Sequence, residues 1–235
     1  MAQTFKVFPD EDLLAQSVSS LAVADILQGL AEKSIFHLAL TGGKSGNLVS
    51  DFLCREFNED PSRFAGLHIW WGDERFVATT STERNDYLLN RNMRQNSFIH
   101  LHPVLSPEAV DDVEMAAKRY NTDLVGIEMD LGVFGVGPDG HIASLFPALW
   151  KSDEGRSDEE RSVIAIRDSP KPPPQRVTFT MRKINSINRL WMIAAGESKR
   201  ELVEKIVAAD MQLPVCHARG VSESLIFVDQ ASAPI

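Results

Sequence analysis

Short runs of apolar, branched residues alternate along this chain with longer segments in which apolar residues recur at three- and four-residue steps. The short runs are expected strands, at residues 5–8, 35–40, 67–71, 129–136, 162–166, 176–180, 190–195 and 224–229. The longer segments are expected helices, at residues 11–33, 46–57, 85–93, 107–121 and 197–209. Such alternation is typical of βα units around a parallel sheet. The sequence therefore predicts an α/β fold, with a doubly wound, mostly parallel sheet and helices on both faces, as a single domain over residues 1–235.

The composition argues against several classes of protein. Hydrophobic residues make up 43% and charged residues 24% of the 235 residues, as in soluble globular proteins. The net charge of −9 and the lack of a Lys/Arg cluster argue against nucleic acid as a partner. The first residues do not form a signal sequence and no segment is an uninterrupted apolar run, so we expect a cytoplasmic protein with no membrane partner. Two cysteines, Cys54 and Cys216, are too few for a disulfide framework.

Three polar segments follow expected strands, at residues 41–47 (TGGKSGN), 72–76 (GDERF) and 137–141 (GPDGH). In a parallel sheet, ligands collect beyond the carboxyl ends of the strands. We therefore expect these three segments to line one rim. Two further stretches are expected to be loops: the charged residues 151–161, and the proline-rich residues 169–176, which should form a stiff approach to the next strand.

The first polar segment ends like a nucleotide-binding P-loop but lacks its first glycine, because Leu38 stands at that position. What remains is a Gly-Gly turn at the start of an expected helix. Its backbone N–H groups and the positive end of the helix dipole suit a single phosphate. A tight turn capped by Ser45 or Asn47 is an equally good interpretation of the same residues.

Gly135, Gly137 and Gly140 match the GxGxxG pattern of a dinucleotide-binding turn. Asp139 would place a negative charge beside the pyrophosphate, and no ribose-binding acid ends a second strand about twenty residues later. These departures argue against a nucleotide cofactor.

His141 is a candidate general base. At the first turn of an expected helix, the positive end of the dipole would keep its ring neutral and able to accept a proton. Asp139 could orient the ring or bind substrate hydroxyls. A capping or packing histidine is the alternative interpretation.

Asp73 and Arg75 follow a buried strand. Arg75 could hold a phosphate or a developing oxyanion, and Asp73 could hold a sugar hydroxyl or fix Arg75, although a surface ion pair is equally compatible with the pattern. The remaining histidines, His37, His68, His100, His102 and His217, do not form a ligand set with three members at metal-binding spacing, so we expect no catalytic metal. No G-x-S-x-G is present, so hydrolysis would use activated water.

Taken together, these segments resemble the 6-phosphogluconolactonase family, whose relatives include glucosamine-6-phosphate deaminase. The resemblance covers nearly the whole chain, through residues 38–46, 68–77, 83–90, 129–147, 172–180 and 194–203. The most specific part is DGHIASLFP, because deaminases share its DGHIA and then continue differently. The residues Ser144, Leu145, Phe146 and Pro147 therefore favour a lactonase.

The resemblance implies a modified Rossmann-like fold and hydrolysis of 6-phospho-D-glucono-1,5-lactone to 6-phosphogluconate, without a cofactor, by a monomer or weak homo-oligomer. His141 matches the family's proposed base and Arg75 the arginine beside the carbonyl or phosphate. The expected phosphate contacts are Gly42, Gly43, Lys44, Ser45, Arg176 and Lys199. Asp73 and Asp139 match positions that line the sugar, and Asp139 is also expected to act in catalysis with His141 and Arg75. Asn85 and Gly140 are further expected substrate contacts. Lys44 stands where many relatives carry serine or threonine, and Arg84 has no assigned role.

Three other functions share parts of this pattern. Deamination of an amino-sugar phosphate would fit DGHIA. A non-catalytic sugar-phosphate sensor would use the same anion-binding turns. A nucleotide-binding oxidoreductase is the weakest alternative, for the reasons given for the GxGxxG pattern.

Overall fold

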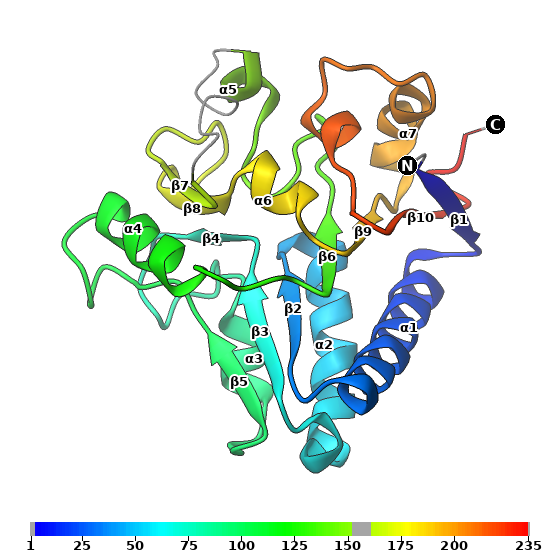
Figure 1. The fold of residues 1–235 in the computed structure, drawn as a ribbon. Helices are drawn as coiled ribbons and strands as arrows, with labels where there is room; N and C mark the ends of the chain where they lie inside the picture. The colour runs from blue at the N-terminus through cyan, green and yellow to red at the C-terminus, as the bar shows by residue number, and fades with distance from the viewer. Residues whose placement is uncertain (1–2, 152–160, 235) are drawn as a thin grey trace.

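A computed structural model, which describes residues 3–151 and 161–234, has a seven-stranded parallel sheet at its centre (Figure 1). The strand order is β1-β10-β9-β6-β2-β3-β5, and every pair is parallel. The strands are β1 (Thr4–Phe8), β2 (Phe36–Leu40), β3 (Leu67–Trp71), β5 (Ile99–His102), β6 (Leu131–Gly135), β9 (Arg189–Ile193) and β10 (Glu223–Asp229). This architecture confirms the predicted α/β fold.

A second, three-stranded antiparallel sheet corrects part of the sequence prediction. It contains β4 (Asp73–Arg75), β8 (Arg176–Phe179) and β7 (Val163–Ile166), in that order. The segments 162–166 and 176–180 were expected in the parallel sheet, but an apolar run does not specify its partner strand. β4 and β5 were not predicted, because one is a short charged segment and the other contains two histidines. Most of the charged loop expected at 151–161 lies outside the described residues.

Gly72 passes the chain from the large sheet to the small one. Its N–H donates to Leu40 O at 2.7 Å, and its carbonyl accepts from the N–H of Phe179 at 2.7 Å. A Cβ at this position would lie 2.5 Å from the ring of Phe134. Only glycine allows the two sheets to approach this closely at the end of β3.

Helices cover both faces of the large sheet. On one face lie α1 (Glu11–Glu32), α2 (Gly43–Glu59) and α3 (Tyr87–Asn92), and on the other side lie α4 (Val113–Asp123), α6 (Met181–Asn185) and α7 (Arg200–Val207). Short helices complete the chain at Pro61–Phe64, Pro147–Lys151 (α5), Glu197–Lys199 and Pro214–His217. In β6, Val133 faces one apolar core and Phe134 the other, as the alternation of side chains along a strand requires.

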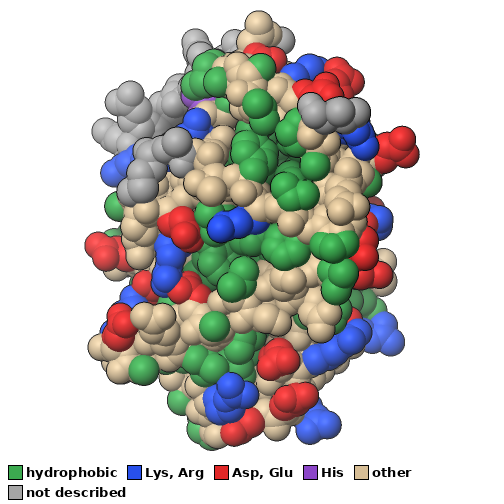
Figure 2. Space-filling model, turned by 90° about the vertical axis from the view of Figure 1, so that its right-hand side faces the viewer, with side chains coloured by type: hydrophobic (Ala, Val, Ile, Leu, Met, Phe, Trp, Pro, Cys, Tyr) green, Lys and Arg blue, Asp and Glu red, His purple; other side chains and the backbone are tan. Residues whose placement is uncertain are grey.

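The helix α1 is apolar on more than its buried side. By length and composition alone it could span a bilayer, with a mean hydropathy of 1.3, which the sequence analysis did not expect. Leu14, Val18 and Ile26 are fully buried in the core beneath the sheet. Leu13 and Leu21 are exposed, and Figure 2, viewed from the side of α1 and β1, shows hydrophobic side chains gathered on this face. The apolar composition therefore reflects a core helix with some apolar residues on its outer side as well.

The strand order changes direction between β2 and β6. From β2 the chain continues outward through β3 and β5, whereas from β6 it continues in the other direction through β9 and β10. The loops that leave β2 and β6 therefore separate, and a crevice forms at the carboxyl ends of these strands. A hydrogen bond from the N–H of Gly135 to Thr41 Oγ1, 2.8 Å, holds the two strand ends together beneath the crevice.

Candidate functional site

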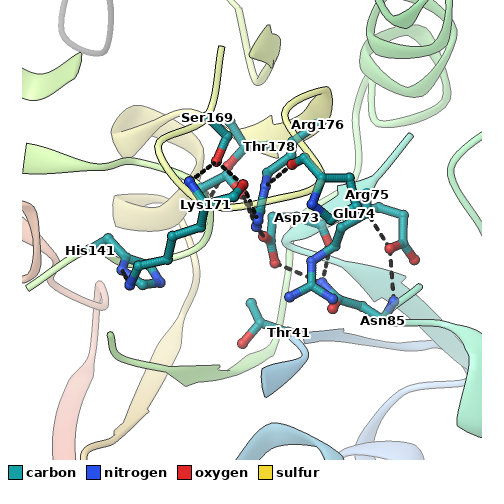
Figure 3. A network of polar contacts seen from close by, with 12 residues as sticks. Thr41, Asp73, Glu74, Arg75, Asn85, His141, Ser169, Lys171, Arg176 and Thr178 are labelled. Atoms are coloured by element: carbon teal, nitrogen blue, oxygen red, sulfur yellow. Dashed lines mark hydrogen bonds and ion pairs between the residues drawn. The ribbon is translucent and has the colours of Figure 1, made fainter. Parts of the chain in front are cut away.

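A cavity of about 430 Å³ occupies this crevice. As the sequence predicts, all three polar segments line it. They contribute residues 41–46, Asp73, Arg75, Gly137, Pro138 and His141, and they are joined by Gly135, Val136, Asn85, Arg176 and residues 195–199. Asp139 and Gly140 are not among the lining residues. In Figure 3, Asp73, Arg75 and Arg176 come from the small sheet, and Thr41, Asn85 and His141 come from loops.

His141 does not begin a helix, so the expectation of a helix dipole at its ring is wrong. Residues 138–140 form a turn, Gly140 has a positive φ of 83°, and α5 begins only at Pro147. The N–H of Gly137 donates to His141 O at 3.0 Å and closes the turn. The ring therefore does not lie at the positive end of a helix dipole.

Two charged side chains contact the ring of His141. Its Nδ1 lies 2.5 Å from Asp139 Oδ1, and Lys171 Nζ lies 3.1 Å from the same oxygen and 3.3 Å from Nδ1. Burial by itself would raise the pKa of Asp139, but the hydrogen bonds and charges of His141 and Lys171 outweigh it and hold that pKa well below its ordinary value. An ionised Asp139 accepts the proton of Nδ1, which leaves Nε2 with the free lone pair.

Gly137 makes room for this ring. A Cβ on Gly137 would lie 1.9 Å from His141 Cε1 and 2.7 Å from Asp139 Oδ1. The ring also lies beside the ring of Phe146, with 4.6 Å between ring centroids. The glycine-rich pattern thus accommodates an imidazole against the backbone, and the interpretation as a dinucleotide turn is not needed to explain it.

A buried polar network supports the opposite wall. Asp73 Oδ1 accepts from Asn85 Nδ2 at 2.9 Å, and Asp73 Oδ2 accepts from the Ser144 hydroxyl at 2.7 Å. Asn85 Oδ1 is buried and, within the described residues, has no hydrogen-bond partner. A Cβ on Gly42 would lie 1.8 Å from this oxygen. Asp73 is thus largely occupied within the protein, whereas Asn85 Oδ1 is an unpaired acceptor buried against Gly42.

Glu74 and Arg84 were not assigned by the sequence analysis. Glu74 is fully buried, and its carboxylate accepts the backbone N–H groups of Arg75, Asn85 and Asp86 at 2.7, 2.8 and 3.0 Å. Arg84 donates to Asp86 at 2.6 Å and lies 3.8 Å from Glu74. Burial raises the pKa of Glu74 to about 8, while Arg84 and the N–H donors oppose this shift. These contacts fix the backbone of the segment that carries Asn85. In the sequence, only the alternating charges of DER and ERND could have indicated such a network.

The two arginines of the site differ in how many of their hydrogen-bond donors are already paired within the protein. Arg176 donates to the carbonyls of Lys171, Pro172 and Pro173 at 3.0 to 3.1 Å, so most of its guanidinium is occupied. Arg75 keeps a buried Nε that has no partner among the described residues.

Lys199 approaches the cavity from the loop after β9. Its Nζ donates to Val136 O at 2.5 Å. Burial, reinforced by the charge of Lys171, lowers the pKa of Lys199 to about 8, against the opposing effect of Asp139 and Glu11. A bound anion would stabilise the protonated form.

Lys44 and Ser45 both contact Glu11, a residue that the sequence analysis did not single out. The Ser45 hydroxyl donates to Glu11 Oε1 at 2.9 Å, and Lys44 pairs with the other carboxylate oxygen. The Lys44 side chain is 81% exposed. No side chain caps α2 in the described structure, and its N-cap is Gly42. The side chains of Lys44 and Ser45 are thus occupied by Glu11, and the remaining donors of this turn are its backbone N–H groups.

Known proteins match this chain over nearly its whole length. Residues 9–227 match the family described as glucosamine-6-phosphate isomerases/6-phosphogluconolactonase. The 6-phosphogluconolactonase of Streptomyces coelicolor is 32% identical, over 97% of this chain and 92% of the relative. That of Mycobacterium leprae is 30% identical, over 99% and 98%.

Solved structures show the same fold. The 6-phosphogluconolactonase of Thermotoga maritima has a TM-score of 0.81 at 23% identity and covers 97% of this chain and 100% of that one. A monomeric glucosamine-6-phosphate deaminase has a TM-score of 0.76 at 20% identity, over 98% of both chains. Because the matched residues include nearly every segment that lines the cavity, the chain belongs to the glucosamine-6-phosphate isomerase/6-phosphogluconolactonase family.

Proposed function

We propose that this protein is a lactone hydrolase that converts 6-phospho-D-glucono-1,5-lactone to 6-phosphogluconate, with His141 as the general base. Relatives at 30% and 32% identity over nearly the full length carry the name of this activity. The observation that carries the proposal is the pairing of His141 Nδ1 with Asp139 at 2.5 Å, beside a cavity that His141 lines.

The proposed reaction begins with a water molecule at His141 Nε2. The ring takes a proton from the water as its oxygen attacks the lactone carbonyl carbon, and the carbonyl oxygen becomes an oxyanion. When the intermediate collapses, the bond from this carbon to the ring oxygen breaks, and the imidazolium returns the proton to that leaving oxygen. Asp139 stabilises the imidazolium between these steps, and Arg75, which lines the cavity, would donate to the oxyanion. A general base of this kind contributes typically about 10²–10⁴-fold.

The phosphate of the substrate would bind at the Gly42–Gly43 turn. The N-terminus of α2, a helix of 17 residues, carries unsatisfied N–H groups and the positive end of the helix dipole. Lys199 adds a cation at the same cavity, and Arg176 contributes little further, since most of its donors are occupied. Lys44 would contribute mainly its backbone N–H, because its ammonium pairs with Glu11. The reaction as proposed uses no metal and no cofactor.

A coupled spectrophotometric assay tests the proposal. The lactone is generated fresh, and its disappearance with purified protein is compared with a buffer blank, since the lactone also opens spontaneously. We expect a protein-dependent rate well above the blank. A rate equal to the blank would overturn the proposal; with retained binding of 6-phosphogluconate it would indicate a sensor. Release of ammonia from glucosamine 6-phosphate would instead support the deaminase alternative.

A further inference from the structure

Lys171 contacts the catalytic pair without lining the cavity. Its Nζ lies on the Nδ1 side of His141, 3.3 Å from Nδ1 and 3.1 Å from Asp139 Oδ1. Figure 3 shows its side chain reaching from the loop after β7 to the ring. A lysine that touched substrate would be expected to line the cavity with Lys199. Lys171 therefore acts on the reaction through His141 and Asp139.

The backbone of the loop that carries Lys171 is fixed by hydrogen bonds from neighbouring side chains. Arg176, which is buried, donates to Lys171 O at 3.0 Å and to Pro172 O at 3.1 Å. The Ser169 hydroxyl donates to the same Lys171 carbonyl at 2.9 Å. Prolines on both sides of Lys171 further restrict the backbone. The origin of the lysine side chain is thus fixed, which reduces the entropy lost when the ammonium is held at one carboxylate.

We propose that Lys171 is a positioning residue that balances the charge of Asp139 and so keeps His141 neutral and ready to accept a proton. This inference rests on the proposed role of His141 as the base. The charged groups in contact with the ring are Asp139 on its own turn and Lys171 on the proline loop. Lys199 interacts electrostatically with both Asp139 and Lys171. Without Lys171, the carboxylate would favour the imidazolium, and the base would be lost at a higher pH.

The magnitude follows from Coulomb's law. A unit charge at about 4 Å shifts a protonation equilibrium by about one pH unit when water screens the pair strongly, and by more when it does not. The Lys171 side chain is 41% exposed, so we take the lower value. Lysine-to-methionine substitution removes the charge and retains most of the length of the side chain.

The experiment compares Lys171→Met with Lys171→Arg and with a matched control, Lys205→Met. Lys205 is also half exposed, at 47%, and also pairs with one carboxylate, Glu201, at 2.6 Å. Two quantities are measured: the acid limb of the kcat/KM profile against pH, and the pH midpoint at which the His141 ring gains a proton. The second is read by NMR of histidine-labelled protein without substrate, with the signal assigned from His141→Gln.

We expect Lys171→Met to move both the acid limb and the NMR midpoint upward by about one pH unit. Lys171→Arg retains the charge, so its midpoint should lie close to that of the wild type. Lys205→Met should leave the midpoint unchanged. An unchanged midpoint would overturn the proposal; if KM alone rose, Lys171 would be a substrate ligand. The NMR midpoint needs no turnover, so it tests Lys171 even if the wild-type protein fails to hydrolyse the lactone, a result that would count only against the proposed function.

Discussion

The histidines of this protein lie in two different environments, one at the cavity and one on the strands of the large sheet. His141 lies at the cavity with its Nδ1 on a carboxylate and a lysine beside it. His37, His68, His100 and His102 lie together on β2, β3 and β5, where the strand register places His37 beside His68 and His68 beside His100.

The rings of this strand cluster contact one another and tryptophan instead of charged partners. His68 Nδ1 lies 2.8 Å from His102 Nε2, and Trp70 Nε1 donates to His37 Nδ1 at 3.0 Å. Trp70 stacks on His102 with 3.8 Å between ring centroids. Within the described residues, no carboxylate is hydrogen-bonded to any of the four rings. Burial, reinforced by the charge of His68, lowers the pKa of both His37 and His102 to about 4.

The comparison shows that a half-buried histidine is not by itself a candidate base. In the strand cluster, protonation of His37 or His102 would place charge among other rings without a hydrogen-bonded carboxylate, so burial favours the neutral form of these two rings and they act as packing groups. At His141, the Asp139 carboxylate can stabilise the imidazolium, and the positive charge of Lys171 opposes this stabilisation. The difference lies in the partners, and it can be tested from both sides.

The largest effect is expected from His141→Ala. Loss of the base should lower lactone hydrolysis above the spontaneous rate by about 10²–10⁴-fold, while the affinity for 6-phosphogluconate stays largely intact. The matched variant His102→Gln, in the strand cluster, should keep wild-type turnover. Equal turnover of wild type and His141→Ala would show that His141 is not the base. It would then not differ in function from the histidines of the strand cluster.

A smaller effect is expected from Gly137→Ala. The added methyl group overlaps the His141 ring, so the ring must move, and a misplacement of about 1 Å can cost about 10²-fold in kcat. The melting temperature should change little, because φ at Gly137 is not in the left-handed region and the clash is with side-chain atoms. Unchanged kcat would show that the position of the ring does not limit the reaction.

The smallest effect concerns stability and comes from the strand cluster. Because the folded-state pKa of His37 and His102 lies below the unfolded value of about 6.5, the unfolded chain binds more protons between about pH 6.5 and 4. The free energy of unfolding should therefore fall as the pH falls through this window, by about 1–2 kcal/mol for each ring, less than the full shift since both are only half buried.

Chemical denaturation at pH 7 and pH 4.5 measures this loss. Carboxylates titrate in the same window, so the difference between wild type and His102→Gln is the quantity that matters. His102→Gln should be less sensitive to acid than the wild type. An identical pH dependence would show that the cluster tolerates protonation, contrary to the comparison.

Several features of the site could be predicted from the sequence because they follow from chain direction. The segments that begin at Thr41, Gly72 and Gly137 each follow a parallel strand, and parallel strands place their carboxyl ends at one edge. Other features could not be predicted, because they depend on contacts between residues distant in the chain. Glu11 binds Lys44 and Ser45 across 33 and 34 positions, and Lys171 contacts His141 across 30 positions.

The sequence by itself determined the alternation of strands and helices, the edge at which the polar loops meet, and the resemblance to a family. Local periodicity and motif spacing are properties of neighbouring residues, so they can be read without coordinates. Only the tertiary structure decided that β4, β7 and β8 form a separate sheet, that His141 follows a turn instead of starting a helix, and that Lys171 reaches its ring. Strand partners and charge contacts depend on distances through space, and packing of the whole chain sets those distances.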